Sequence, residues 1–401
     1  MIHKFKVENF YSINEEQVLD FTSKKKYSGS YGEYDDSYIG LINCFVGANA
    51  SGKTNLFKAL SFLLWFAENS FYKISENTGR LFSPHKLREN DTTNFEVIFD
   101  MNNNLYKYNL SLTVDSVVSE KLEIKSKKGF SYIYKLENKD GNISIKYNRN
   151  NDILSKINPK EENRFIKSKR MVSFFSFLIG VGYFDEIGLT GITKEGFRNV
   201  FSHGSISLDS RKESIILSKR LEKSEFKDKI LLYLKSFDLG IEDYVQDKFK
   251  ARINDEVVDL IGFKHSSNDK DFKLSIFDES AGTVKGLYLL LNLFKVLFNG
   301  GIAIIDELDS RLHYEIAKTL VNLFADKDIN TKNAQLFFST HQALFLNDRD
   351  KAQIFLAYKE DSLNTEVYRL DTIPGIRNTE NFAEKYLSGE YGAIPRIEGC
   401  L

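Results

Sequence analysis

The sequence has few cysteines and almost no net charge. Its two cysteines are Cys44, inside an apolar run, and Cys400, next to the end, and this pattern indicates neither a disulfide framework nor a metal site. A reducing compartment is therefore expected. The formal net charge of −1 creates no global field that would draw the chain to nucleic acid or to an anionic membrane, so a DNA contact would need a local basic patch.

The sequence also lacks an export signal and a long apolar run. Residues 1–6 alternate apolar and polar side chains, which is typical of a strand rather than of a signal peptide. The most apolar stretches, residues 60–67 and 287–298, are shorter than the about 18 residues that a membrane span needs. We expect no membrane contact and a cytoplasmic location.

The composition is that of an ordinary globular protein, with 42% hydrophobic and 28% charged residues in a chain of 401. Alternating side chains predict a β-hairpin over residues 2–21 and an antiparallel meander over residues 94–147. Residues 41–46 are mostly apolar and predict a buried strand. Residues 52–67 have apolar positions at helical spacing and predict a helix. Between them lies a glycine-rich segment.

In residues 153–237 the apolar side chains recur mostly at helical spacing. Residues from about 211 to 237 predict one charged helix. This segment lacks the sustained heptads of a long coiled coil. From residue 272 onward, helices and strands alternate, as in α/β proteins. We predict an α/β fold with three segments, which are an N-terminal part over residues 1–150, a helical insertion over 151–255 and a C-terminal part over 256–401.

The strongest motif is the glycine-rich segment Gly47-x4-Gly52-Lys53-Thr54. Its glycines allow backbone N–H groups to turn toward phosphates, while the lysine meets the β- and γ-phosphate oxygens and the threonine meets Mg²⁺. The strand before it and the helix after it complete the order that a P-loop requires. The motif predicts binding of ATP or GTP.

Two acids follow a second apolar strand. Residues 302–305 are apolar, and Asp306 and Glu307 come directly after them. Such a strand would deliver Asp306 to Mg²⁺ and Glu307 to the attacking water. The alternative is that the second acid is only structural.

Two further segments would complete a nucleotide site. Glu279-Ser280-Ala-Gly282-Thr283 opens a helix and would present donors to an anion, although alone it is only a helix N-cap. His341 ends another apolar strand and would reach the γ-phosphate from the opposite side, although a lone histidine is more often structural. The four segments together are harder to explain by chance than any one of them.

Their order resembles that of ABC-type ATPases. The sequence of the P-loop, with Gly47, Asn49, Ser51 and Asn55, is similar to that of the SMC, RecF and OLD branch rather than to that of transporters. The Ser280 segment resembles AAA-type ATPases of bacterial abortive-infection and anti-phage systems, including those encoded beside RloB-type proteins. Residues 7–13, 95–99 and 386–395 also resemble recurrent segments of that group. The glutamine that ABC proteins usually place on Mg²⁺ has no clear counterpart between residues 68 and 95, where His85 and Lys86 lie.

The resemblance implies a composite site in which the P-loop of one subunit and the signature of the other, here residues 279–283, enclose each nucleotide. One P-loop and one signature per chain then predict a homodimer or a larger homo-oligomer. Asp309 and Ser310 resemble the D-loop that crosses such an interface, and an ordinary helix N-cap is an equal alternative. The predicted nucleotide-binding residues are Gly47, Asn49, Ser51, Gly52, Lys53, Thr54, Asn55, Ser280, Gly282 and Asp309, the predicted Mg²⁺ ligands are Thr54 and Asp306, and the predicted catalytic residues are Glu307 and His341.

We expect an ATP-hydrolysing sensor and scaffold that controls a separately encoded effector, either a nuclease or an RloB-like protein. Only residues 342–401 follow His341, too few for a further domain of ordinary size. The alternative is a RecF-like repair ATPase that binds nucleic acid. Its basic patch would come from Lys24–Lys26, Lys125 with Lys127 and Lys128, or Lys167 with Lys169 and Arg170, but charge runs are more often solvated faces. A transporter ATPase subunit is a third and weaker alternative.

Overall fold

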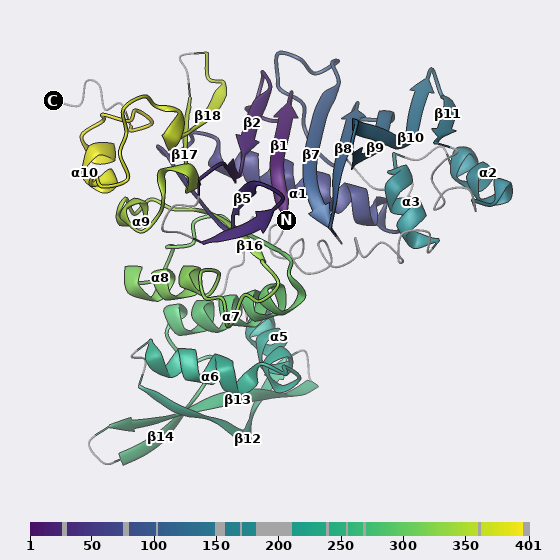
Figure 1. Cartoon of the computed structure of the whole chain (residues 1–401). Helices are drawn as coiled ribbons and strands as arrows, with labels where there is room; N and C mark the ends of the chain where they lie inside the picture. Colours follow the sequence, from purple (N-terminus) through teal and green to yellow (C-terminus); the bar gives the residue numbers. More distant parts are fainter. Residues whose placement is uncertain are drawn as a thin grey trace.

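The computed structural model describes residues 1–25, 30–74, 80–101, 103–148, 157–168, 171–181, 211–237, 240–253, 256–267, 270–359 and 362–395. Figure 1 shows two parts. An upper row contains the larger sheets, and below it a stack of helices leads to a separate three-stranded sheet.

The mainly parallel sheet carries both predicted phosphate-site strands. Its order is β15 (Ile302–Ile305), β16 (Gln335–Ser339), β6 (Ile42–Val46), β17 (Ile354–Lys359) and β18 (Thr365–Arg369). The first four strands run parallel, and β18 pairs with β17 in the antiparallel sense. Every residue of β15, β16 and β6 is buried, as expected for strands covered on both faces.

The predicted meander forms a seven-stranded antiparallel sheet. Its order is β11-β10-β9-β8-β7-β1-β2, so the N-terminal hairpin extends the meander. The bounds are β1 (Ile2–Glu8), β2 (Gln17–Asp20), β7 (Thr93–Met101), β8 (Asn104–Leu112), β9 (Val117–Ser126), β10 (Gly129–Lys139) and β11 (Asn142–Tyr147). The chain after β2 forms a small three-stranded sheet, with the order β3 (Thr22–Ser23), β5 (Ser37–Gly40) and β4 (Tyr31–Tyr34). The predicted α/β class and meander are confirmed.

Helices cover the two sheets. Helix α1 (Lys53–Lys73) follows the P-loop and packs against α3 (Phe174–Gly180). Below the parallel sheet lie α7 (Ala281–Asn299) and α8 (Tyr314–Asn322), as Figure 1 shows. Other helices among the described residues are α2 (Pro159–Ser168), α5 (Arg211–Glu222), α6 (Lys227–Ser236), α9 (Leu344–Asn347) and α10 (Phe382–Leu387), with short 3₁₀ turns at Lys351–Gln353 and Leu370–Thr372.

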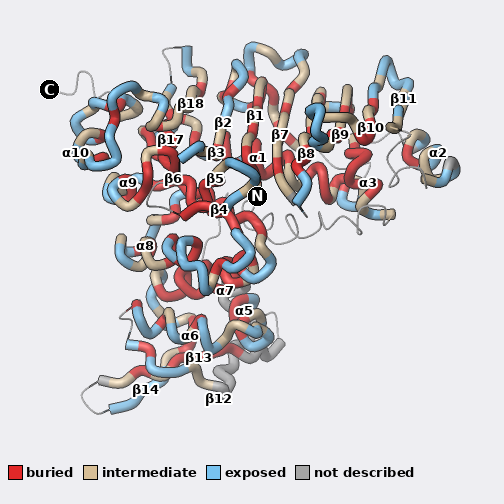
Figure 2. Tube along the Cα trace, in the orientation of Figure 1, coloured by how far each residue is buried: buried red, intermediate tan, exposed pale blue. Residues whose placement is uncertain are grey.

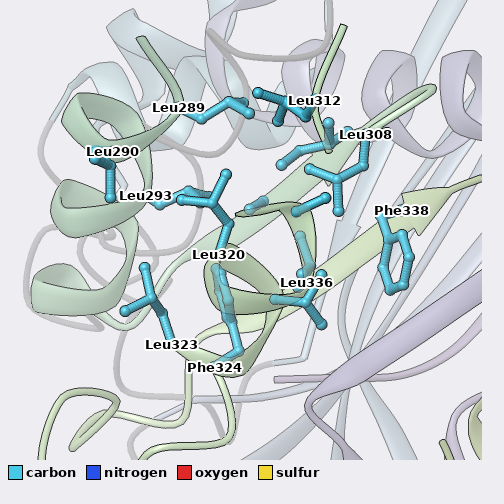
Figure 3. Packing of buried hydrophobic residues seen from close by; sticks show 14 of the residues in the cluster. Leu289, Leu290, Leu293, Leu308, Leu312, Leu320, Leu323, Phe324, Leu336 and Phe338 are labelled. Atoms are coloured by element: carbon cyan, nitrogen blue, oxygen red, sulfur yellow. The ribbon is translucent and has the colours of Figure 1, made fainter. Parts of the chain in front are cut away.

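The parallel sheet divides two hydrophobic cores. Along β15, Ile302 and Ile304 face the core of α1 and the antiparallel sheet, whereas Ala303 and Ile305 face the core of α7 and α8. This alternation follows from the two-residue repeat of a strand. Figure 2 shows buried residues along α1 and α7, and Figure 3 shows leucines of α7 and α8 packed against side chains of β16. The sheet thus holds the two phosphate-site strands between two packed layers.

Helix α7 is a core helix. Its length of 19 residues and mean hydropathy of 1.4 would by themselves allow it to cross a membrane, and it is longer than the apolar run seen in the sequence at residues 287–298. However, 72% of its most apolar window is buried inside the protein. Burial against β15, β16 and α8 accounts for this hydropathy.

The segment predicted as a helical insertion, residues 151–255, is not uniformly helical. It includes β12 (Ile241–Ile253), which pairs with β13 (Glu256–Ser267), and β13 pairs with β14 (Lys270–Ser275). The boundary predicted at residue 255 therefore separates two hydrogen-bonded strands. The helix predicted from about 211 to 237 is divided into α5 and α6. Residues 182–210 of the predicted insertion lie outside the described residues.

The beginning of that segment packs with the N-terminal part. The buried carboxylate of Glu120 on β9 accepts hydrogen bonds from the backbone N–H groups of Phe174 and Phe175, at 2.8 and 2.9 Å. It also accepts one from Tyr134 Oη at 2.7 Å. Glu120 thus fixes the start of α3 on the meander, because a buried carboxylate needs such donors to offset its lost hydration.

Candidate nucleotide-binding site

A cavity of about 730 Å³ opens at the carboxyl ends of the parallel strands. It includes most of the P-loop and both acids of the second motif. Its lining residues are Asn49, Ala50, Ser51, Gly52, Lys53, Thr54, Asn55, Asp306, Glu307, His341 and Lys359. Ligands of α/β sheets usually bind at this end of the strands. Lys359, the last residue of β17, was missed in the sequence because no motif surrounds it.

The P-loop glycines are fixed by neighbouring strands. A Cβ atom on Gly47 would approach the Ala357 carbonyl oxygen to 2.1 Å, and one on Gly52 would approach Thr365 Oγ1 to 2.0 Å. Gly52 also has a φ of 103°, and Ala50 has a φ of 61°. These left-handed conformations turn successive backbone N–H groups into the loop, which is how a P-loop binds phosphate.

Lys53 crosses the inside of this loop. Its Nζ donates to the carbonyl oxygens of Gly47 and Ala48, at 2.9 and 3.0 Å. Burial lowers the pKa of Lys53, and the negative charges of Asp306 and Glu307 partly oppose that shift. A buried ammonium beside a ring of backbone amides suits the β- and γ-phosphates of a nucleotide.

Asn55 joins the P-loop to the N-terminal hairpin. Its Nδ2 donates to Ser12 Oγ at 2.7 Å, and Ser12 Oγ lies 2.7 Å from Thr365 Oγ1. The backbone N–H of Thr365 also donates to the Ser12 carbonyl at 2.8 Å. Ser12 therefore connects the P-loop helix to β18 through hydrogen bonds. The sequence of residues 7–13 did not predict this role.

The loop before β7 is organised by Asn9, which is fully buried with a φ of 54°. Its Nδ2 donates to the carbonyl oxygens of Arg88 and Asp91, at 3.1 and 3.2 Å, and its Oδ1 accepts from the His85 backbone N–H at 2.9 Å. Burial is the main cause that lowers the pKa of His85. Neither His85 nor Lys86 is among the described residues that line the cavity.

The C-terminal segment, residues 386–395, touches the P-loop directly. The Ala48 backbone N–H donates to the Ala393 carbonyl at 3.1 Å, and Tyr386 Oη donates to the same oxygen at 3.3 Å. A segment far along the chain thus supports the first half of the phosphate loop. Residues 386–395 therefore have a structural role at the P-loop.

The metal-binding prediction places Thr54 and Asp306 together, and they are neighbours in the structure. Thr54 Oγ1 donates to Asp306 Oδ2 at 2.6 Å. Ser339 Oγ, at the end of β16, donates to Asp306 Oδ1 at 2.5 Å. A hydroxyl and a carboxylate oxygen are ligands that Mg²⁺ prefers when substrate phosphates and water complete its shell. The residues present therefore fit the metal.

Glu307 is held in an unusual backbone conformation. Its φ is 50°, and its backbone N–H donates to Ser339 Oγ at 2.8 Å. Its Oε1 lies 3.9 Å from His341 Nε2. The two side chains are 60% and 40% exposed, so both reach the open side of the cavity. Ser339 supports both acids, and the sequence offered no sign of this beyond its place at a strand end.

The signature lies outside the cavity of its own chain. Ser280 is the exposed N-cap of α7, where its Oγ accepts from the Thr283 backbone N–H at 3.0 Å. A Cβ atom on Gly282 would lie 3.3 Å from the Arg311 carbonyl oxygen. Asp309 does not line the cavity, and its Oδ2 accepts from the His341 backbone N–H at 3.3 Å. The N-cap alternative for Ser280 is therefore observed within one chain.

The basic patch candidates are only partly described. Lys125, Lys127 and Lys128 are exposed at the end of β9 and in the turn before β10, and Lys125 Nζ lies 3.6 Å from Asp35 Oδ2. Lys26, Lys169 and Arg170 lie outside the described residues. The exposed lysines form no part of the cavity lining.

The P-loop, the acid pair and the flanking strands lie together at one end of the parallel sheet. A family model described as "AAA domain, putative AbiEii toxin, Type IV TA system" matches residues 42–176 and 192–347, which include all four predicted motifs. Among solved structures, the SMC head domain from Thermotoga maritima is similar to the chain with a TM-score of 0.41 and 14% identity, over 92% of this chain and 98% of that one. No curated protein matches the sequence.

Proposed function

Because the chain belongs to this family of AAA domains, we propose that it is a homodimeric ATPase that binds and hydrolyses Mg²⁺-ATP in the cavity beside the P-loop. The observation that supports this best is the network in which Ser339 and Thr54 both donate to Asp306. This network supports the proposal because it joins Thr54, Asp306 and Ser339, which come from three separate parts of the chain.

In this proposal each residue has a defined task. Lys53 and the P-loop amides bind the β- and γ-phosphates, and Thr54 and Asp306 hold Mg²⁺. When bound, the metal neutralises charge on the phosphate oxygens. Glu307 orients the attacking water and accepts its proton, and His341 donates a hydrogen bond on the γ-phosphate side.

Two copies are needed to complete the proposed site. Ser280 and Gly282 lie outside the cavity of their own chain, and Ser280 is exposed. In a two-fold dimer, the partner would supply these donors to the nucleotide held by the first P-loop. The helix N-terminus at Ser280 favours an anion there.

We further propose that this dimer acts as a nucleotide-driven sensor and scaffold for a separately encoded effector, such as a nuclease or an RloB-like protein, in a defence system. The family description, which names a toxin of a toxin-antitoxin system, supports a role with a second component. The exposed lysines at 125, 127 and 128 support the alternative of a RecF-like ATPase that binds nucleic acid.

The central test is phosphate release by the purified chain with Mg²⁺-ATP. We expect turnover in the wild type, none after Lys53→Ala and none with excess EDTA, because each removes charge that the phosphates require. Equal ATP affinity in wild-type and Lys53→Ala protein would contradict the site. DNA that stimulates turnover, with loss of stimulation in a Lys127→Ala and Lys128→Ala double variant, would favour the nucleic-acid alternative over the effector role.

A further inference from the structure

A buried lysine links the signature helix to the proposed catalytic acid. Lys285 lies on α7, five residues after Ser280, and only 5% of its surface is accessible to solvent. Its Nζ donates to the Ser310 carbonyl at 2.5 Å and to the Glu307 carbonyl at 3.3 Å. None of the four segments found in the sequence includes it as a functional residue, because no motif extends to its position.

Placing a charged amine there is energetically unfavourable unless it is well satisfied. Burial lowers the pKa of Lys285 to about 8, and the negative charges of Asp309 and Glu307 oppose the shift. The hydrogen bonds go to main-chain oxygens, so Lys285 constrains the path of the backbone rather than the position of a carboxylate. A methionine of similar length would fill the same space without this constraint.

The backbone that Lys285 constrains is strained. Glu307 and Arg311 have φ values of 50° and 64°, a left-handed conformation that costs free energy in residues other than glycine. The Glu307 backbone N–H is held by Ser339, and its carbonyl is held by Lys285. Both sides of the catalytic residue are thus fixed, one from β16 and one from α7.

The first turns of α7 also contact the end of this segment. Gly282 packs so closely that a Cβ atom would lie 3.3 Å from the Arg311 carbonyl oxygen. Residues 307–311 therefore contact the signature helix at two places, through Gly282 and Lys285. A displacement of α7 would move both contacts together, because a helix moves as a rigid element.

We propose that Lys285 is a positioning residue that couples the two nucleotide sites of the dimer. This inference rests on the proposed composite site, in which Ser280 of a chain serves the partner's nucleotide and Glu307 serves the chain's own. Binding of the partner's nucleotide at Ser280 shifts α7, and Lys285 transmits the shift to the backbone of Glu307. Hydrolysis at one site then depends on occupancy of the other.

The test compares Lys285→Met, which removes the charged donor, with Lys285→Arg, which retains one. Hydrogen exchange is measured across residues 307–312 in Glu307→Gln protein, with and without Mg²⁺-ATP. We expect ATP to change exchange in this segment when residue 285 is Lys or Arg, but not when it is Met. Exchange at the P-loop should respond to ATP in all three proteins, because the P-loop does not depend on Lys285.

In proteins that retain Glu307, the dependence of hydrolysis on ATP concentration supplies a second measurement. The Hill coefficient should exceed 1 for the wild type and for Lys285→Arg, and it cannot exceed the number of sites, which is two in the proposed dimer. It should be about 1 for Lys285→Met, because the two sites then act independently. Lys327→Met is the matched control, because Lys327 is exposed and lies outside the cavity lining. If Lys285→Met does not fold, Lys285→Gln takes its place in both measurements.

The outcomes separate this inference from the proposed function. Absence of an ATP-dependent change in exchange at the P-loop of the Glu307→Gln protein with Lys at position 285 would overturn the proposed function itself. Protection at the P-loop together with an ATP response of residues 307–312 that is the same in Lys285→Met would overturn only the role of Lys285. A wild-type Hill coefficient of 1 would also contradict coupling between the sites.

Discussion

Thr54 and Asp306 are separated by 252 positions in the sequence, yet Thr54 Oγ1 donates to Asp306 Oδ2 at 2.6 Å. Thr54 lies in the first turn of α1, and Asp306 follows β15. Since β16 lies between β15 and β6, the contact spans the carboxyl ends of three neighbouring strands. The sheet order is therefore what assembles the proposed metal site.

Thr54→Ala should weaken ATP binding only when Mg²⁺ is present. The substitution removes one oxygen ligand and leaves the P-loop amides and Lys53 in place. Loss of a hydrogen bond to a charged group is typically about 1.5–3 kcal/mol, which corresponds to roughly a 10- to 100-fold loss of affinity. Titrations of ATP with Mg²⁺ and with EDTA measure the difference, and equal losses in the two conditions would argue against a metal role.

Ser339→Ala should lower turnover more than ATP binding. Ser339 Oγ donates to Asp306 and accepts from the Glu307 backbone N–H, so its loss releases both acids. Loss of a hydrogen bond to a charged group typically costs about 1.5–3 kcal/mol. Ser61→Ala is the control, since Ser61 is also fully buried but bonds only to the Phe57 carbonyl within α1. Both variants should unfold at lower temperature, and only Ser339→Ala should lose turnover.

Glu307→Gln should bind ATP but release no phosphate. The amide preserves the shape of the side chain and cannot accept the proton of the attacking water. ATP should therefore hold this variant as a dimer, visible as a doubling of mass in light scattering. Wild-type phosphate release by the variant would exclude Glu307 as the base, and a monomer at saturating ATP would exclude the composite site.

Mixed dimers should recover activity that neither parent has. A Ser280→Arg chain and a Lys53→Ala chain each lack one half of every site in their own homodimers. In a mixed dimer, the P-loop of the first chain meets the intact signature of the second, and one complete site results. We expect partial phosphate release after mixing, measured beside the dimer fraction. Full dimerisation without any release would indicate that the two sites hydrolyse only together, as strong coupling requires.

Coupling between the sites should depend on pH. The pKa of Lys285 is lowered from 10.5 to about 8 by burial, with Arg311 acting in the same direction and Asp309 and Glu307 against it. Between these values the unfolded chain binds a proton that the folded chain has released, so this group's contribution to stability rises as pH rises. Its charged hydrogen bonds to the backbone weaken over the same range.

The Hill coefficient of the wild type should consequently fall as pH rises through about 8. Lys285→Arg should retain its coefficient to higher pH, because a guanidinium stays charged. Kinetics at pH 7 and pH 9 on both proteins measure the effect. A parallel decline in the two proteins would assign the pH dependence to another group, such as Lys53, whose pKa burial also lowers.

Local patterns were sufficient for the elements that bear the motifs. The strands before Gly47 and Asp306 and the start of the helix after Gly52 appear within one residue of their predicted bounds, whereas the helix extends to Lys73 rather than to residue 67. Each depends on the spacing of apolar residues among near neighbours, which the sequence displays directly. The α/β class and the meander follow from the same repeats.

Spacing was ambiguous in β12. Its apolar residues Ile241, Val245, Phe249 and Ile253 recur every fourth position, which fits one face of a helix and equally one face of a strand. Pairing of this segment with β13 selects the strand. The helical insertion was therefore wrong at this point because a contact outside the segment decided its conformation.

The sequence alone was sufficient to predict which residues bear the phosphate chemistry, because the P-loop motif and the acid pair are each continuous in the chain. Only the tertiary structure decided what supports them. Ser12 meets Thr365 across 353 positions, and Ser339 meets Asp306 across 33. Lys285, on α7, contacts the carbonyl of Glu307 in the turn after β15. Such contacts follow from strand order and helix packing, and no local pattern of side chains encodes the distance between two strand ends.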